Sequence, residues 1–281
     1  MSRRSLIVVA DDFGLTAGTS RAILDCFRSG IVTATSVLVN APGFDASMSM
    51  LRDEPALEVG LHGALVGEDP PVCDPARIPT LVDRRGRLAG SWRALLPRLA
   101  AGRVDPCDVE RELAAQLARL RSAGLRASHL NLHQHLQLWP SVRTVVVELC
   151  AREGIGYVRT PASTRSGPRG AALRRLAQHL RDELATAGVA TNDAFAGLDE
   201  AGAWSTSALE REITRIPGDV VEINVHPGAD QDVHRSRYRW GYQWGRERDA
   251  LLRPELGDAV ERAGFELTGP GQVATGRRGV G

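Results

Sequence analysis

Two adjacent carboxylates, Asp11 and Asp12, directly follow an apolar segment near the start of the chain. That segment, residues 6–10, consists of Leu, Ile, Val and Ala, which predicts a buried β-strand. Placing two negative charges beside a hydrophobic core is costly unless something compensates them, and a metal ion would do so. The pair therefore indicates either a metal site or, in the simpler alternative, the N-cap and turn of a helix that starts soon afterwards.

Histidines stand at the ends of two further predicted strands. His62 comes directly after residues 57–61, where a structural histidine would be the simpler interpretation. A later segment carries polar side chains at every second position, which strand alternation places on one face, opposite leucines. These side chains are His129, Asn131, His133 and His135. A buried face cannot hold three imidazoles without partners, and clustered imidazoles indicate a zinc-type site.

A fourth segment, residues 220–225, alternates between apolar and polar side chains and leads into His226. Glu222, Asn224 and His226 share one face of this predicted strand, so His226 is expected at the mouth of a barrel. One carboxylate and two imidazoles that converge from strand ends form a ligand set with open positions for water and substrate. Such a set is typical of a catalytic rather than a structural metal site.

The elements that would position these residues alternate between short β-branched segments and longer amphipathic ones, which is typical of βαβ units. The predicted strands cover residues 6–10, 34–39, 57–61, 127–132, 156–159 and 220–225, with weaker ones near 189–192 and 265–268. The predicted helices cover residues 20–29, 106–123, 142–153, 169–187, 207–215 and 254–263. We therefore expect a single barrel-like α/β domain over residues 1–281.

Two long stretches match no regular element. Residues 63–90 are rich in Pro, Gly and Asp, and residues 228–248 are rich in Arg and aromatic side chains. We expect a loop insertion over about 63–104 and a late loop over about 228–248. Loops of this length within a compact domain are usually functional, so both are expected to take part in the site.

The composition excludes several classes of enzyme. All 35 basic side chains are Arg, and the absence of Lys excludes Schiff-base and pyridoxal phosphate enzymes, P-loop NTPases and protein kinases. A net charge of +1 gives no indication of nucleic acid or anionic membrane as a partner. The sequence has no apolar run long enough for a membrane span or a signal peptide, and its cysteines lie in no metal-ligand spacing. We therefore expect a cytoplasmic protein with reduced cysteines.

In order and spacing, four blocks of this sequence resemble the YdjC/ChbG-like carbohydrate deacetylase family. The blocks are Ala10-Asp11-Asp12-Phe13-Gly14, Gly60-Leu61-His62, His129-Leu130-Asn131-Leu132-His133-Gln134-His135 and His226-Pro227. The resemblance covers roughly residues 5–268. It implies a distorted TIM-like β/α barrel with long substrate-binding loops, and hydrolysis of the acetamide of an N-acetylated sugar with release of acetate.

The resemblance also implies roles for individual residues. Asp12, His62 and His133 resemble the metal ligands, Asp11 the general base, and His226 the acid that protonates the departing amine. The departures from the family pattern are Asn131, where the family often has Asp, and Gln134 and Gln137, which replace histidines. These departures leave the orientation of the ligands and the identity of the substrate open.

The cofactor implied is one divalent metal ion, and the partner is a small N-acetylated sugar. Two histidines and one aspartate suit Zn²⁺ best, while Mg²⁺, Mn²⁺ and Co²⁺ remain compatible. Aromatic faces stack on sugar rings, so several side chains could line the sugar site, with loop anchoring as the alternative. They are Arg159 at a strand end, Trp92 beside the early loop, and Trp240 and Trp244 in the late loop. Homo-oligomerisation stays open.

Two other functions fit part of the pattern. A phosphoesterase or another barrel metallohydrolase would commonly hold two metals and need further carboxylates, and few stand at strand ends beyond Asp11, Asp12 and Glu222. A non-catalytic sugar-binding relative would keep the fold and lose turnover. Metal analysis and acetate release from N-acetylated sugars would separate the three hypotheses.

Overall fold

The structure is a computed structural model, which describes residues 4–232 and 234–278. Its strands are β1 (Arg4–Phe13), β2 (Ala34–Val37), β3 (Glu58–Gly63), β4 (His129–Leu132), β5 (Tyr157–Val158), β6 (Ala194–Ala196), β7 (Val220–Val225) and β8 (Phe265–Leu267). Its α-helices are α1 (Ala17–Ser29), α2 (Phe44–Arg52), α3 (Trp92–Ala100), α4 (Pro106–Ser122), α5 (Pro140–Glu153), α6 (Pro168–Thr186), α7 (Thr206–Arg215), α8 (Trp244–Leu251), α9 (Glu255–Arg262) and α10 (Pro270–Arg278). Short 3₁₀ turns are η1 (Pro75–Arg77), η2 (His133–Leu138) and η3 (Arg235–Arg237).

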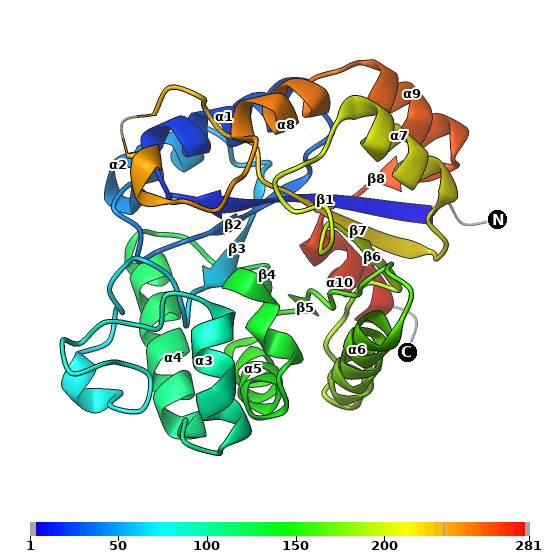
Figure 1. The fold of residues 1–281 in the computed structure, drawn as a ribbon. Coiled ribbons are helices and arrows are strands. Elements are labelled where there is room, and N and C mark those ends of the chain that lie inside the picture. The colour runs from blue at the N-terminus through cyan, green and yellow to red at the C-terminus, as the bar shows by residue number, and fades with distance from the viewer. Residues whose placement is uncertain (1–3, 233, 279–281) are drawn as a thin grey trace.

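The strands form one parallel sheet in the order β5-β4-β3-β2-β1-β7-β6, with β8 beside the first residues of β1. The sheet curls into a half-barrel, with helices packed around it and β1 running through the middle of the molecule (Figure 1). The expected α/β fold with a distorted TIM-like barrel is confirmed. Because the strands are parallel, their carboxyl ends lie at one edge, where the chain places its carboxylates and imidazoles.

The middle of the central strand β1 is apolar on both faces, because Leu6, Val8 and Ala10 pack into one buried cluster and Ile7 and Val9 into another. Residues 6–10 are fully buried, and they pair with β7 along one edge and with β8 and then β2 along the other. The same pattern places Val221, Ile223 and Val225 of β7 in the core. These strands hold the carboxyl edge of the sheet rigidly, since each is fixed by neighbours on both sides.

The prediction of a strand near 189–192 was wrong, because the strand in this part of the chain is β6, at Ala194–Ala196. Ala190 makes only an isolated bridge to Tyr157 of β5. The side chain of Asn192 then bonds main-chain groups, donating to the carbonyls of Thr160 and Ala194. These contacts replace a regular ladder where the short strands β5 and β6 leave the barrel wall incomplete.

Helix α4 begins and packs as its sequence predicts. The Asp105 carboxylate accepts from the backbone N–H of Cys107, and the side chains that recur at helical spacing are buried: Val109, Leu113, Leu117 and Leu120. Two polar residues on the same helix bind the early loop. Gln116 exchanges two hydrogen bonds with the backbone of Ala64, and Glu112 accepts from two backbone N–H groups of the loop. The irregular stretch 63–90 is thus held by side chains rather than by a ladder.

Four helices were not predicted: α2, α3, α8 and α10. Helix α3 occupies the end of the expected insertion 63–104 and contains Pro97, which masks its helical pattern. Helix α8 begins at Trp244, inside the expected late loop, where aromatic and arginine side chains obscure the periodicity. Within the described ranges, no helix combines the length and apolar character that a membrane crossing needs.

Candidate metal centre

A break in the regularity of β1 brings both of its carboxylates to one place. The register between β1 and β2 shifts between Ala10 and Phe13, and Asp12 adopts a left-handed backbone with φ 70°. In a regular strand the two side chains would point to opposite faces. Here Asp12 Oδ1 lies 3.4 Å from His62 Nε2, and Asp11 Oδ1 lies 4.0 Å from His62 Nδ1. Strained backbone of this kind collects at functional sites.

Asp12, His62 and His133 converge from β1, β3 and the end of β4. His62 Nε2 lies 3.2 Å from His133 Nδ1, and Asp12 Oδ1 lies 3.8 Å from His133 Nδ1. All three side chains are buried, and neither carboxylate oxygen of Asp12 has a hydrogen-bond partner within the described residues. Burial and the neighbouring charge of Asp11 raise the pKa of Asp12 well above its usual value. A divalent cation fits this donor set, because it would compensate the orphaned carboxylate and bind both imidazoles.

The side-chain amide of Asn131 connects the two halves of the site. Its Oδ1 accepts a hydrogen bond from His62 Nδ1, and its Nδ2 donates to Asp11 Oδ1 at 3.2 Å. The Nε2 atom of His62 is thereby left to face Asp12 and His133. Asn131, one of the departures from the family pattern, therefore orients His62, one of the three potential ligands.

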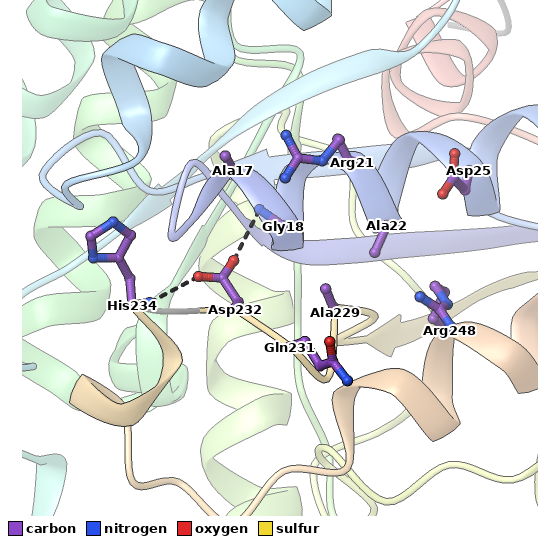
Figure 2. Close-up of a pocket in the computed structure, with 10 residues that line it drawn as sticks. All are labelled: Ala17, Gly18, Arg21, Ala22, Asp25, Ala229, Gln231, Asp232, His234 and Arg248. Atoms are coloured by element: carbon purple, nitrogen blue, oxygen red, sulfur yellow. Dashed lines mark hydrogen bonds between the residues drawn. The ribbon is translucent and has the colours of Figure 1, made fainter.

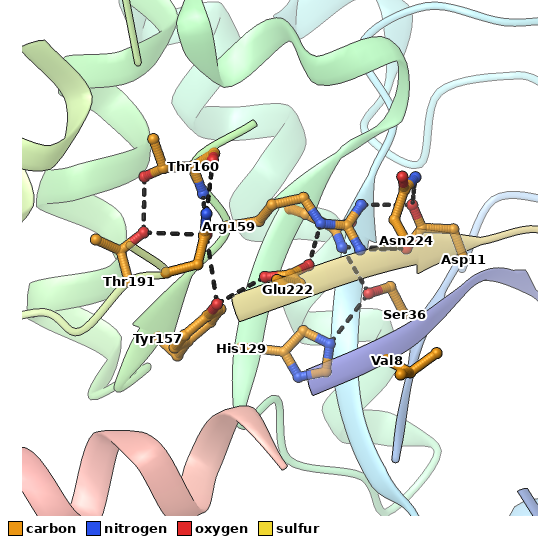
Figure 3. Close-up of polar contacts among 12 residues, drawn as sticks. Val8, Asp11, Ser36, His129, Tyr157, Arg159, Thr160, Thr191, Glu222 and Asn224 are labelled. Atoms are coloured by element: carbon orange, nitrogen blue, oxygen red, sulfur yellow. Dashed lines mark hydrogen bonds and ion pairs between the residues drawn. The ribbon is translucent and has the colours of Figure 1, made fainter. Parts of the chain in front are cut away.

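A buried arginine, Arg159, holds the carboxylate of Asp11, as Figure 3 shows. The Arg159 guanidinium donates to both of its oxygens, and Asn224 Nδ2 donates to Oδ2 at 3.3 Å. Although burial acts to raise the pKa of Asp11, the charge of Arg159 and its hydrogen bonds to the carboxylate outweigh it and lower that pKa. Arg159 also donates to Glu222. Asp11 is therefore an ionised carboxylate whose orientation is fixed.

His226 approaches Asp11 from the opposite side, at the end of β7. Its Nε2 lies 4.0 Å from Asp11 Oδ2, and burial lowers its pKa to about 4. Behind it, the buried Glu247 of α8 accepts from the backbone N–H of His226 at 2.6 Å. His226 Nδ1 lies 4.0 Å from the same carboxylate oxygen. Sequence reasoning did not find Glu247, because its helix was not predicted.

His135 does not join His133, which corrects the expectation that the polar run shares one face. Strand β4 ends at Leu132, and both Gln134 and His135 take φ 57°, so the alternation stops at His133. The ring of His135 packs edge-on against Phe195 instead, with centroids 5.8 Å apart. His129 also lies outside the ligand set, bonded to serines beneath it.

The two glutamines that depart from the family pattern support this turn. Gln134 Oε1 accepts from the backbone N–H of Trp92 at 2.6 Å, and Gln137 Oε1 accepts from that of Leu132 at 3.3 Å. Both side chains therefore fix the backbone around His133 rather than reaching the triad.

The four side chains expected to line a sugar site lie in different places. Trp240 is half-buried beside the triad, with its ring 5.0 Å from that of His133 and its Nε1 donating to Glu68. Trp244 is buried behind Trp240, and the centroids of the two rings are 6.0 Å apart. Arg159 forms ion pairs with the carboxylates of Asp11 and Glu222, and Trp92 is the first residue of α3. Tyr242 packs 4.8 Å from the ring of His226 and is a further aromatic at the mouth.

A cavity of about 430 Å³ lies away from these residues, between α1 and the late loop. Figure 2 shows Asp232 at its wall, accepting from the backbone N–H groups of Gly18 and His234. Those bonds tie the late loop to α1. None of the triad lines this cavity. A much smaller cavity, about 10 Å³, touches His133 and Trp240.

Comparisons with known proteins match nearly the whole chain. A family model described as YdjC-like protein matches residues 5–262. A carbohydrate deacetylase of Brevibacillus brevis is 35% identical over 265 residues, which is 93% of this chain and 96% of that protein. A carbohydrate deacetylase of Listeria monocytogenes is 30% identical over 232 residues, covering 82% of this chain and 84% of that protein.

One solved structure has the same fold. It is a protein of Enterococcus faecalis V583 named for cellobiose-phosphate cleavage, with a TM-score of 0.79 and 24% identity. The alignment covers 95% of this chain and 98% of that one. At this level of identity the likeness establishes the shared fold alone.

Proposed function

Because this chain belongs to the YdjC-like protein family, we propose that it is a metal-dependent hydrolase that removes an N-acetyl group from a sugar and releases acetate. The observation that carries the proposal is the meeting of three potential ligands, Asp12, His62 and His133, beside the ionised Asp11. The names of the relatives supply the class of substrate. We also propose that residues 1–281 form a single β/α-barrel metallohydrolase domain.

Asp12, His62 and His133 would hold the metal. When bound, a divalent ion polarises an amide carbonyl and lowers the pKa of a water molecule towards ~7. Two imidazoles and one carboxylate favour Zn²⁺, and Mg²⁺, Mn²⁺ and Co²⁺ are the alternatives to be tested. The burial of all three residues would exclude bulk water from the ion.

Asp11 would take the proton from the attacking water. Its carboxylate is ionised, lies 4.0 Å from His62, and cannot turn away because Arg159 holds both oxygens. His226, on the other side of Asp11, would take up the proton that Asp11 removes from the water and donate it to the amide nitrogen as the C–N bond breaks, so that the products are a free amine and acetate. Acid–base groups of this kind typically contribute ~10²–10⁴-fold each.

Trp240 and Tyr242 would receive the sugar. Their rings lie beside His133 and His226, one on each side of the reacting centre, and contact each other at 5.6 Å. Aromatic faces of this kind pack well on sugar rings, whose C–H groups are apolar. The small cavity beside His133 and Trp240 would form part of the approach to the metal.

The test combines metal analysis with an acetate assay on the purified protein. We expect one divalent ion per chain, acetate release from at least one member of a panel of N-acetylated sugars, and loss of activity with a chelator. Two ions per chain with phosphatase activity would replace the proposal by a phosphoesterase. Metal binding with no acetate from any sugar would support a non-catalytic sugar-binding protein instead.

A further inference from the structure

His129 lies on β4 beneath the metal centre, and the proposed reaction does not use it. Its ring is buried, and both of its nitrogens have partners. Figure 3 shows the contact between Ser36 and the His129 ring. Ser36 Oγ lies 3.1 Å from Nε2, and Ser128 Oγ lies 2.9 Å from Nδ1. A fully satisfied buried polar chain of this kind can fix the proton positions of the groups at its end.

The first step follows from the charge of Asp11. Its carboxylate is ionised by Arg159 and can only accept, so Asn131 must turn its Nδ2 towards Asp11. The Oδ1 of Asn131 then faces His62 Nδ1, and a hydrogen bond between them requires the proton on Nδ1. His62 Nε2 is left with a lone pair, as metal binding needs.

The second step follows the other N–H of the Asn131 amide. Nδ2 also donates to Ser36 Oγ at 2.7 Å, so the Ser36 hydroxyl is free to donate to His129 Nε2. His129 then carries its proton on Nδ1 and donates to Ser128 Oγ, and Ser128 donates to the carbonyl of Val59 at 3.1 Å. If His129 Nε2 instead donated to Ser36 Oγ, the Ser36 hydroxyl proton would have no acceptor among the described residues.

We propose that Ser36 and His129 are positioning residues of the metal centre, which act through Asn131 to hold His62 as the tautomer with a free Nε2. The proposal rests on the metal site of the proposed function and concerns how that site is kept ready for the ion. The Ser36 contact and the Asp11 contact both require the same orientation of the Asn131 amide. Without Ser36, the amide loses one of the two acceptors that prevent it from turning over.

The surrounding structure leaves space for the His129 ring in this series of hydrogen bonds. Gly60 of β3 faces the His129 ring, and a Cβ at that position would overlap the ring atoms. Burial lowers the pKa of His129 to about 3, so the ring is neutral and can accept on Nε2 while it donates from Nδ1. A glycine in the middle of a strand is costly, and here the space that it leaves is filled by the imidazole.

The test compares Ser36→Ala with the matched control Thr35→Val. Both substitutions remove a buried hydroxyl from β2. Thr35 Oγ1, however, donates to the carbonyl of Ala10 and takes no part in the series of hydrogen bonds that leads to His62. We expect Ser36→Ala to weaken zinc binding by ~10–100-fold in a chelator competition, as loss of a partner behind a ligand typically does. Nitrogen-15 NMR of the metal-free protein should show His62 moving towards the Nε2-protonated form. Thr35→Val should change neither measurement.

Ser128→Ala provides a milder variant in case Ser36→Ala does not fold. It removes the acceptor of His129 at the half-buried end of the chain and should weaken zinc binding in the same direction by a smaller factor. Zinc affinity and His62 tautomer equal to those of the wild type in both serine variants would overturn the inference. A wild-type protein that binds no divalent metal would instead remove the proposed function itself, so the two failures are distinguishable.

Discussion

Asp11 and Arg159 form a two-pronged buried ion pair, with Arg159 Nη1 at 2.5 Å from Oδ2 and Nη2 at 2.8 Å from Oδ1. Both side chains are about 1% exposed, so water does not screen the pair. The guanidinium therefore fixes the direction of the carboxylate as well as its charge. The same arginine is held on its other edge by Glu222, which leaves it no second position.

The first prediction concerns this pair. Arg159→Lys keeps the positive charge but loses the planar fork that binds both oxygens. We expect kcat to fall by about 10²-fold, since a misplacement of about 1 Å in a reacting group has that effect. Metal content should stay at the wild-type value, because Arg159 touches none of the three potential ligands. Unchanged kcat would show that the orientation of Asp11 does not matter.

The second prediction concerns Asp11 itself. Asp11→Asn removes the proton acceptor while Asp12, His62 and His133 remain, so the protein should bind metal yet lose turnover by ~10²–10⁴-fold. Acetate release and elemental analysis on the same sample provide the two measurements. Asp25→Asn, at an exposed position on α1, is the control and should retain full activity. Retained turnover in Asp11→Asn would remove its role as the base.

The third prediction separates two neighbouring histidines. His133→Ala should lower the metal bound per chain, whereas His135→Ala should not, because His135 packs on Phe195 outside the triad. Thermal unfolding gives a second measurement. An ion that binds only the folded state adds about 2.7 kcal/mol at 100 times its Kd, so added metal should raise the Tm of the wild type and of His135→Ala. Equal metal content in the two variants would contradict the assignment of ligands.

The fourth prediction concerns the aromatic side chain beside the triad. Trp240→Ala should raise KM for the sugar while leaving the metal content unchanged, because the ring contacts His133 without offering a ligand atom. Trp92→Ala is the control, since Trp92 is tied to Gln134 through its backbone N–H rather than its ring. A larger rise of KM in the control than in Trp240→Ala would place the sugar near α3.

The positions of the potential ligands could be predicted from the sequence, because the ends of strands can be predicted from it. Asp12, His62 and His133 each stand at or just after the end of a predicted strand, and parallel strands carry such residues to one edge. Alternation also placed Glu222 and Asn224 correctly on the polar face of β7, where they reach Arg159 and Asp11. Local pattern and tertiary structure agree at these positions.

The remaining parts of the site depend on backbone conformations that local pattern does not encode. The left-handed Asp12 lets consecutive carboxylates share one site, and the left-handed Gln134 and His135 separate His135 from His133. Such conformations are locally unfavourable and persist only because the surrounding contacts determine them. Glu247 was missed for a related reason, since tertiary packing rather than periodicity makes α8 a helix.

The last prediction uses Glu247, which is fully buried behind His226. Burial raises its pKa from 4.5 to about 8, so the folded protein keeps the carboxyl protonated where the unfolded chain has already ionised it. The folded state therefore binds more protons between pH 4.5 and about 8, and the contribution of Glu247 to stability is lost as the pH rises through that window. Glu247→Gln keeps a carbonyl for the backbone N–H of His226 but cannot ionise. Its Tm relative to the wild type should rise from pH 5 to pH 8, whereas Glu261→Gln, on the exposed face of α9, should show no such trend. A difference in Tm that is the same at both pH values would show that the Glu247 carboxyl is not buried in its neutral form.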